Sequence, residues 1–295
     1  MRPHQWVKNV FVLAALVFAL GEMGPNAPTA AERIVRVLFA AGAFCLGASA
    51  IYLVNDVADV ESDRLHPTKR NRPIAAGQVS IPVALMASVA CVAGALALAQ
   101  QATPEDGESV MLIVSVYMFS NLLYSLKLKQ IAIVDAFIIA LGFLLRVVAG
   151  AHAAAAPVSH WILLSTFFLA LFLAFCKRRA EIDLLGADAA SHRKNLGQYT
   201  PQFLDQATTV LAACAIITYA MYTVDEGTVE KFGSDGRLIW TVPFVVFGLF
   251  RYLLLVQRQE GGGSPTKVLL GGDTVFVLNA LAWAGIVLGC LFLGK

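Results

Sequence analysis

Charged residues are scarce in this sequence. Asp, Glu, Lys and Arg make up 14% of its 295 residues, whereas 58% of the residues are hydrophobic. Soluble domains carry about 25% charged residues, so the composition excludes an ordinary soluble protein and indicates an integral membrane protein. The formal net charge of +2 gives no basis for nucleic-acid binding. The five cysteines form no CxxC pair, and we interpret them as small apolar side chains.

Long apolar runs recur along the whole chain, and each is close to the about 20 residues that a helix needs to span a bilayer. They predict an all-α, polytopic membrane protein that forms a single domain over residues 1–295. The second run is rich in Gly, Ala and Ser, as helices packed closely inside a bundle are. The nine predicted transmembrane helices are residues 7–23, 34–54, 81–101, 109–126, 131–150, 158–176, 204–224, 238–256 and 274–293.

Lysine and arginine concentrate in alternate segments between the predicted spans. Residues 64–72, 127–129 and 177–194 hold half of the 22 Lys and Arg residues, whereas the segments on the other side of the predicted spans are mainly acidic or neutral. Cytosolic segments of membrane proteins carry such an excess of basic residues. The asymmetry predicts a multi-pass protein of the cytoplasmic membrane with a cytosolic N-terminus.

The most informative polar stretch is NDVADVESDRLHPTKRNRPIAAG, which runs from Asn55 to Gly77 between the second and third predicted spans. Asp59 and Asp63 follow Asp56 by three and seven residues, so a helix turning by ~100° per residue places all three on nearly one face. Carboxylates gathered in this way repel one another unless a cation holds them. Mg²⁺ binds through carboxylates and substrate phosphates. We therefore predict a Mg²⁺ site on Asn55 and the three aspartates.

Cations follow these carboxylates directly. Lys69, Arg70 and Arg72 supply positive charge of the kind that phosphate oxygens bind. Carboxylates for a metal beside cations for phosphate predict a diphosphate site. The alternative that the spacing leaves open is a solvated loop at the membrane interface.

Other polar residues lie near the ends of the predicted spans. Asn121, Tyr124 and Lys127 are three residues apart, on one helical face at an inner end. Asp135 opens the fifth span, where a lone acid is costly unless it faces a polar cavity. Arg146 lies near the outer end of that span, and we interpret it as snorkelling to the outer surface. The concentration of the remaining groups on one side favours a cytosol-facing active site over a transporter, which would place charges near the membrane midplane.

A second polar segment follows the sixth predicted span. Lys177, Arg178 and Glu181 lie within one helical turn, and Lys194 and Tyr199 come further along the same segment. A basic cluster at this position also fits simple contact with anionic lipid head groups. The sequence alone leaves that alternative open.

Together these motifs resemble those of the UbiA superfamily of intramembrane prenyltransferases, a family of nine-helix proteins, and the resemblance covers essentially the whole chain. Residues 55–77 resemble its first aspartate-rich motif. Three segments are most similar to the decaprenyl-phosphate phosphoribosyltransferase branch: RPHQWVKN (2–9), HPTKRNRPIAAG (66–77) and CKRRAE (176–181). The N-terminal motif belongs to the mature enzyme in that branch. We therefore reject the alternative of a secretory signal in residues 1–31, which basic and apolar residues there also fit.

The chain departs from the family pattern in one place. Family members that use prenyl diphosphates carry a second DxxxD motif after the sixth helix. Here Asp183 and Asp188 lack that spacing, and cations precede them. The resemblance therefore implies a lipid phosphate held by Lys and Arg at this position instead of a second metal–diphosphate site.

The resemblance implies a Mg²⁺-dependent pentosyltransferase. It would move 5-phosphoribosyl from phosphoribosyl diphosphate to a polyprenyl (decaprenyl) phosphate in the membrane, for synthesis of an envelope polysaccharide precursor such as that of arabinogalactan. The alternatives are a UbiA-type prenyltransferase with an aromatic acceptor, and a transporter or lipid-binding protein without catalysis; a homo-oligomer is left open. The implied catalytic residues are Asp56, Asp59, Asp63, Lys177 and Glu181. The implied substrate-binding residues are Lys8, Asn9, Asn55, Lys69, Arg70, Arg72, Asn121, Tyr124, Lys127, Arg178, Lys194 and Tyr199.

Overall fold

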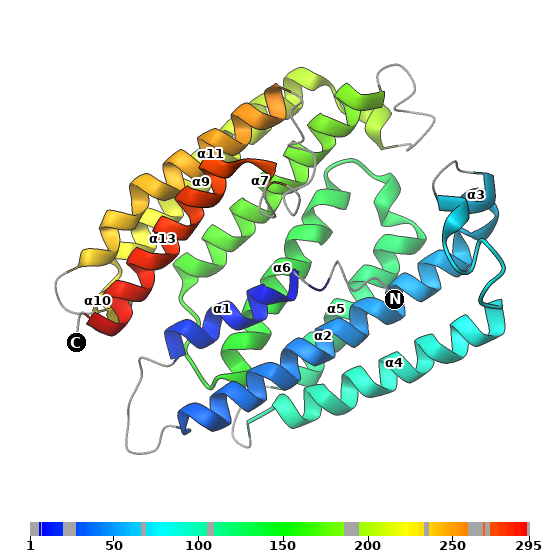
Figure 1. Cartoon of the computed structure of the whole chain (residues 1–295), viewed down its shortest axis with the longest axis horizontal. Coiled ribbons are helices and arrows are strands. Elements are labelled where there is room, and N and C mark those ends of the chain that lie inside the picture. The colour runs from blue at the N-terminus through cyan, green and yellow to red at the C-terminus, as the bar shows by residue number, and fades with distance from the viewer. Residues whose placement is uncertain are drawn as a thin grey trace. The chain divides into compact units, whose positions relative to one another are not determined.

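The computed structural model of the chain describes residues 6, 8–19, 28–65, 69–104, 109–185, 195–232, 236–258, 268 and 272–293. Regular structure within these ranges is entirely helical, without a strand, which confirms the predicted all-α class (Figure 1). The helices and short 3-10 turns are α1 (Val10–Ala19), α2 (Ala30–Ala58), α3 (Val60–Leu65), η2 (Lys69–Asn71), α4 (Ile81–Ala102), α5 (Val110–Leu126), η3 (Leu128–Gln130), α6 (Val134–Ala153), α7 (His160–Leu185), η5 (Leu196–Gln198), α9 (Pro201–Val224), α10 (Glu226–Phe232), η6 (Arg237–Thr241), α11 (Val242–Gln257) and α13 (Thr274–Leu293).

Seven helical segments among the described residues are long and apolar enough to cross a membrane, which confirms an integral membrane protein. They are α2, α4, α6, α7, α9, η6 with α11, and α13. Every one of the predicted spans overlaps an apolar helix of the described residues, but α5 has only 17 residues and α1 is described over 10. The prediction of nine membrane-spanning helices is therefore not confirmed in number.

The chain divides into two compact units. Unit 1 consists of Met1–Leu128 and Leu145–Pro157, and unit 2 consists of Lys129–Leu144 and Val158–Lys295. Helix α6 contributes its first part to unit 2 and its second part to unit 1. A single domain over the whole chain stays a prediction.

In unit 1, α2 packs along α4, and the two helices run side by side in Figure 1. Small side chains allow this close approach. A Cβ atom on Gly94 would lie 2.9 Å from Cδ1 of Leu46, and one on Gly47 would lie 3.2 Å from Cγ of Met118 on α5. These contacts confirm the interpretation of the small residues in α2 as a packing surface.

Local sequence signals fix where α2 starts. Thr29 is its N-cap and forms a capping box with Glu32: the Glu32 amide donates to Thr29 Oγ1 at 3.3 Å, and the Thr29 amide donates to Glu32 Oε2 at 2.9 Å. The helix then continues to Ala58, which brings its last turn to the aspartate-rich segment.

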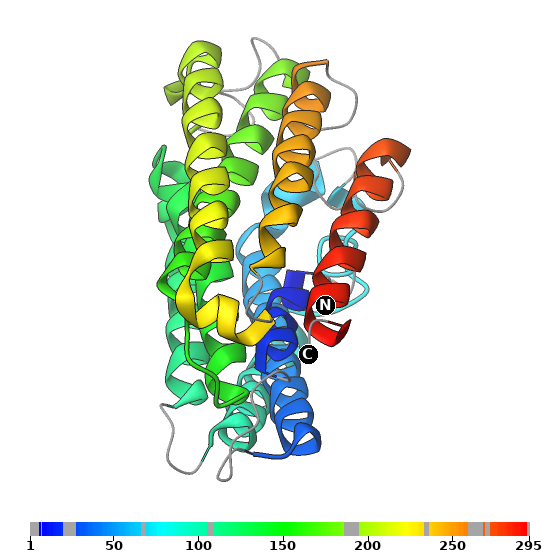
Figure 2. The ribbon, with the colours of Figure 1, turned by 90° about the vertical axis from the view of Figure 1, so that its left-hand side faces the viewer.

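In unit 2, α7 packs against α9, while α11 contacts both helices and α13 packs on α11 (Figure 2). The core between them is aromatic and aliphatic, with the rings of Phe172 and Tyr252 5.9 Å apart between centroids. A second cluster joins the start of α6 to α7 and α9 through Ala136, Phe175 and Leu204. This second cluster holds the first turn of α6 next to the polar residues described below.

Candidate active site

The aspartate-rich segment lies at the junction of α2 and α3. Asp59 caps the end of α2, and the backbone stays close to helical across it, because the Asp59 amide donates to the Asn55 carbonyl at 2.9 Å and the Asp63 amide donates to the Asp59 carbonyl at 2.8 Å. The side-chain amide of Asn55 donates to Asp59 Oδ2 at 2.9 Å. Two of the four predicted metal ligands, Asn55 and Asp59, are therefore in direct contact.

Arg72 joins the other two aspartates. Its Nη1 atom lies 3.3 Å from Asp56 Oδ1 and 2.5 Å from Asp63 Oδ2, and Asp63 is buried with 2% exposure. The two carboxylate oxygens thus both contact one positively charged group and lie no further apart than the sum of these distances. Sequence spacing predicted that Asp56 and Asp63 would share a helical face, and they converge on this nitrogen.

Arg72 is positioned by the turn that follows η2. The Ala76 amide donates to the Arg72 carbonyl at 2.8 Å, and Arg64 Nε donates to the Ala75 carbonyl at 3.3 Å, which ties the turn back to α3. Lys69 and Arg70 are exposed beside it. Two of the three predicted phosphate-binding cations therefore face solvent, while the third is engaged by carboxylates.

The donor set of this segment fits a hard cation. Its candidate metal ligands are carboxylate and amide oxygens, which Mg²⁺ prefers, and Asp56 and Asp63 both contact Nη1 of Arg72. No group of three or more His, Cys, Asp or Glu side chains in the described part of the chain is close enough to hold a metal ion. Metal binding here therefore stays a prediction that includes substrate phosphate oxygens among the ligands.

The predicted site residue Asn9 lies inside unit 1, away from the end of α2. It is buried, its Nδ2 donates to Cys45 Sγ at 3.0 Å, and its Oδ1 accepts from Arg146 Nε at 2.8 Å. Cys45 precedes Asn55 by ten residues, about 15 Å along a helix. Trp6 Nε1 donates to Ser49 on the same helix at 3.4 Å. Trp6 and Asn9 therefore lie along the middle of α2.

The interpretation of Arg146 as a snorkelling residue is wrong. Arg146 is only 6% exposed, and besides Asn9 it donates from Nη2 to the Tyr117 hydroxyl at 2.8 Å. Its Cζ atom lies 4.5 Å from the ring centroid of Tyr117 and 5.3 Å from that of Phe44. The guanidinium is therefore held inside unit 1 by two aromatic rings and two hydrogen-bonding side chains and does not reach the surface.

The remaining predicted residues of unit 1 lie around the end of α5. Asn121 donates from Nδ2 to the Tyr117 carbonyl of its own helix at 2.9 Å. Tyr124 is half-buried, and Lys127 is the exposed C-cap residue of α5. Lys8, next to Asn9, is half-buried. The substrate roles predicted for these residues stay predictions.

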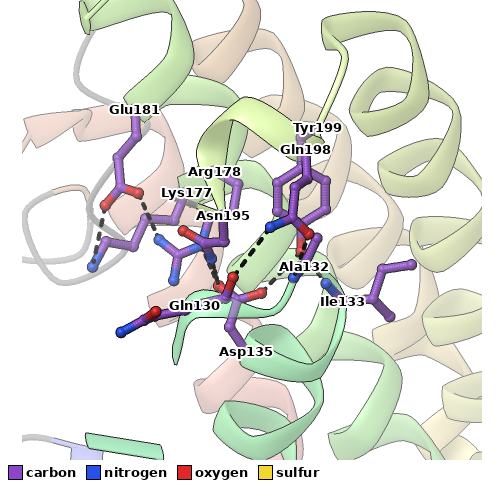
Figure 3. A network of polar contacts seen from close by, with 10 residues as sticks. All are labelled: Gln130, Ala132, Ile133, Asp135, Lys177, Arg178, Glu181, Asn195, Gln198 and Tyr199. Carbon is purple, nitrogen blue, oxygen red and sulfur yellow. Dashed lines mark hydrogen bonds and ion pairs between the residues drawn. The ribbon is translucent and has the colours of Figure 1, made fainter. Parts of the chain in front are cut away.

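The polar centre of unit 2 is the carboxylate of Asp135, in the first turn of α6 (Figure 3). Asp135 is 0% exposed and accepts three hydrogen bonds: from Arg178 Nε at 2.8 Å, from Asn195 Nδ2 at 2.7 Å and from the Tyr199 hydroxyl at 2.9 Å. The amide of Ile133 donates in turn to the Tyr199 oxygen at 2.5 Å. This arrangement is the polar environment that a lone acid at the start of a span requires.

Lys177 and Arg178, two neighbouring basic residues on α7, differ in exposure and in their contacts. Arg178 is 1% exposed and bridges Asp135 to Glu181, to which Nη1 donates at 2.6 Å. The side chain of Lys177 is 49% exposed, and its Nζ lies 3.7 Å from Glu181 Oε1. Of the two predicted phosphate contacts, Lys177 is accessible, whereas Arg178 holds two carboxylates in place.

The hydroxyl of Tyr199, like the guanidinium of Arg178, hydrogen-bonds to other groups of the protein. Burial raises the pKa of its phenol, so the group stays protonated and donates to Asp135. Lys194, also predicted to bind substrate, lies outside the described residues. Sequence reasoning recognised Asp135 as unusual but assigned it no partner, and it missed Asn195, which lies in a segment without periodicity.

The fold is that of UbiA homologues of known structure. The structure aligns with a UbiA homologue from Archaeoglobus fulgidus bound to GPP and Mg²⁺ with a TM-score of 0.72 at 19% identity, covering 98% of this chain and 97% of that one. The structure of the same protein bound to DMAPP and Mg²⁺ gives a TM-score of 0.72 at 20% identity, with 98% and 96% coverage.

The sequence matches the UbiA prenyltransferase family over residues 9–279, and the chain belongs to that family. It is 39% identical over 293 residues to a decaprenyl-phosphate phosphoribosyltransferase from Corynebacterium glutamicum, covering 99% of this chain and 86% of the relative. The corresponding enzyme of Mycobacterium tuberculosis is 39% identical, with 97% and 91% coverage. The nodulation protein NoeC of Azorhizobium caulinodans is 31% identical, with 99% and 91% coverage.

Proposed function

We propose that this protein is a decaprenyl-phosphate phosphoribosyltransferase, which transfers 5-phosphoribosyl from phosphoribosyl diphosphate to a polyprenyl phosphate and releases diphosphate. The observation that carries the proposal is the similarity to two such enzymes over nearly the whole length of each chain. The absence of a second DxxxD motif after the predicted sixth span agrees with it, because the acceptor lipid then brings a phosphate and not a diphosphate.

The donor is assigned to the aspartate-rich segment. Asn55, Asp56, Asp59 and Asp63 would hold Mg²⁺, which neutralises charge on the departing diphosphate when bound. Lys69 and Arg70, which face solvent, supply further positive charge to phosphate oxygens.

The acceptor phosphate is assigned to Lys177, whose ammonium is accessible at the end of the apolar part of α7. Arg178 is proposed to position other residues and not to contact the substrate. It binds Asp135 and Glu181 and so stabilises the conformation of the segment around Lys177. A phosphate oxygen of the lipid forms the new bond to C1 of the ribose as the bond from C1 to the diphosphate oxygen breaks. That nucleophile is already an anion, so no general base is needed, and positioning and charge stabilisation supply the catalysis.

The active site is proposed to face the cytosol, where phosphoribosyl diphosphate is available, with the protein in the cytoplasmic membrane. Support comes from the basic residues that concentrate on one side of the predicted spans. Cysteine labelling from the outside at position 70, in the segment after α3, would contradict this orientation.

A choice between donors tests the function. Purified protein is given labelled phosphoribosyl diphosphate with polyprenyl phosphates of several lengths, and in parallel labelled geranyl diphosphate with an aromatic acid. We expect Mg²⁺-dependent transfer only in the first set, and none when the lipid is an unphosphorylated polyprenol. Transfer of geranyl to the aromatic acid would instead assign the protein to the prenyl-transferring members of the family.

A further inference from the structure

One buried atom in the Asp135 network lacks the partner that its chemistry requires. Asn195 is 0% exposed, and its Oδ1 is the one buried side-chain oxygen or nitrogen of the described residues that makes no hydrogen bond. Buried polar groups are hydrogen-bonded in at least about 90% of cases. A carbonyl left without a donor costs about 1–3 kcal/mol, so an exception in a polar cluster calls for an explanation.

The orientation of the Asn195 amide cannot be reversed to remove the problem. Asp135 is held by the guanidinium of Arg178 and is therefore a carboxylate, which only accepts hydrogen bonds. The Asn195 atom that lies 2.7 Å from Asp135 must then be the donor Nδ2, which makes the other atom the carbonyl oxygen. The Tyr199 hydroxyl cannot serve as the donor for the Asn195 carbonyl, because it donates its single proton to Asp135 while accepting a hydrogen bond from the Ile133 amide.

The carbonyl is also held rigidly. The side chain of Asn195 is hydrogen-bonded to Asp135 on α6, and Asp135 is in turn bound by Arg178 on α7. Arg178 also binds Glu181, which forms an ion pair with Lys177, as Figure 3 shows. The network therefore runs from the buried amide to side chains that are partly exposed. An acceptor held in this way is pre-organised for a donor group of a ligand.

The proposed substrates differ in what they can donate. Phosphate and diphosphate groups near neutral pH are mainly acceptors, and the polyprenyl tail has no polar hydrogen. The ribose ring of phosphoribosyl diphosphate carries free hydroxyl groups, which donate. We infer that Asn195 Oδ1 accepts a hydrogen bond from a ribose hydroxyl of the donor substrate and so makes Asn195 a specificity residue for the sugar. The inference rests on the proposed function and extends it to a residue that the sequence motifs did not indicate.

The test compares donors that differ by one hydroxyl. Initial rates are measured with phosphoribosyl diphosphate and with its 2-deoxy and 3-deoxy analogues, for the wild type and for Asn195→Ala. We expect Asn195→Ala to lower kcat/KM for the full donor by about ten- to a hundredfold. For the analogue that lacks the bonded hydroxyl, the wild type should already show this loss, and the substitution should add little.

Tyr199→Phe is the matched control, because it removes a different hydrogen bond to Asp135 and leaves the Asn195 carbonyl in place. It should affect all three donors by the same factor. If Asn195→Ala does not fold, Asn195→Ser, which keeps a donor for Asp135, is measured in the same way, and its loss should again be greater for the full donor.

An equal loss for all donors on substitution of Asn195 would overturn the inference and leave the carbonyl bonded to buried water. An outcome in which the wild type uses none of the ribosyl donors but transfers a prenyl group has a different meaning, because it refutes the proposed function itself. The two failures are therefore distinguishable in one set of assays.

Discussion

The ion pair between Arg178 and Asp135 should be the most sensitive polar contact in unit 2. Arg178→Met removes the guanidinium from a carboxylate that is 0% exposed and 2.8 Å away. Removing one partner of a buried pair costs about 3–5 kcal/mol, because the other charge stays buried. Asp135 keeps two neutral donors, Asn195 and Tyr199, so we expect the lower end, about 3 kcal/mol.

The free energy of unfolding is measured in mixed micelles for this variant and for two others, which separate the effect of the buried charge from that of losing any cation. Lys177→Met is the matched control, since Lys177 is the neighbouring cation but half-exposed, and its loss should cost less than about 1 kcal/mol. The double variant Asp135→Asn with Arg178→Met removes both charges and should recover most of the lost stability. If Arg178→Met costs no more than Lys177→Met, the reasoning about a buried pair is refuted.

Three other predictions follow from unit 1. Arg146→Lys should lower the free energy of unfolding by about 2 kcal/mol, because an ammonium cannot reach both acceptors that the guanidinium holds; stability equal to the wild type would contradict this. Gly150→Ala should destabilise by about 1–3 kcal/mol, since its Cβ would overlap a backbone carbonyl of α1. The control Gly285→Ala, where a Cβ meets nothing within 4 Å, should leave the thermal midpoint unchanged or higher. Asp56→Ala should abolish both turnover and the Mg²⁺-dependent rise in thermal midpoint in the presence of phosphoribosyl diphosphate. Exposed Glu61→Ala should keep both, and retention of both by the Asp56 variant would refute the metal assignment.

The elements that the sequence predicted well are those set by local patterns. Apolar runs predicted each long helix, because the length needed to cross a bilayer is a property of a single segment. The seven-residue spacing of Asp56 and Asp63 predicted that they would converge, since the chain stays nearly helical across Asp59.

The contacts that the sequence did not predict join residues far apart in the chain. Arg178 and Asp135 are 43 residues apart, and Arg146 and Asn9 are 137 apart. No spacing rule relates such pairs, because they meet only when helices pack. Arg146 was therefore assigned from its position along one span, which says how deep a residue lies but not whether it faces lipid or another helix.

The proposed function is tested most directly by the chemical identity of the lipid product. Purified protein is incubated with decaprenyl phosphate, phosphoribosyl diphosphate labelled in the ribose, and Mg²⁺, and the extracted lipid is analysed by mass spectrometry. The account predicts a lipid heavier than decaprenyl phosphate by one phosphoribosyl group, formed together with one diphosphate and absent when Asp56→Ala replaces the wild type. Label that stays entirely in the aqueous phase, under conditions in which the protein is folded, would contradict it.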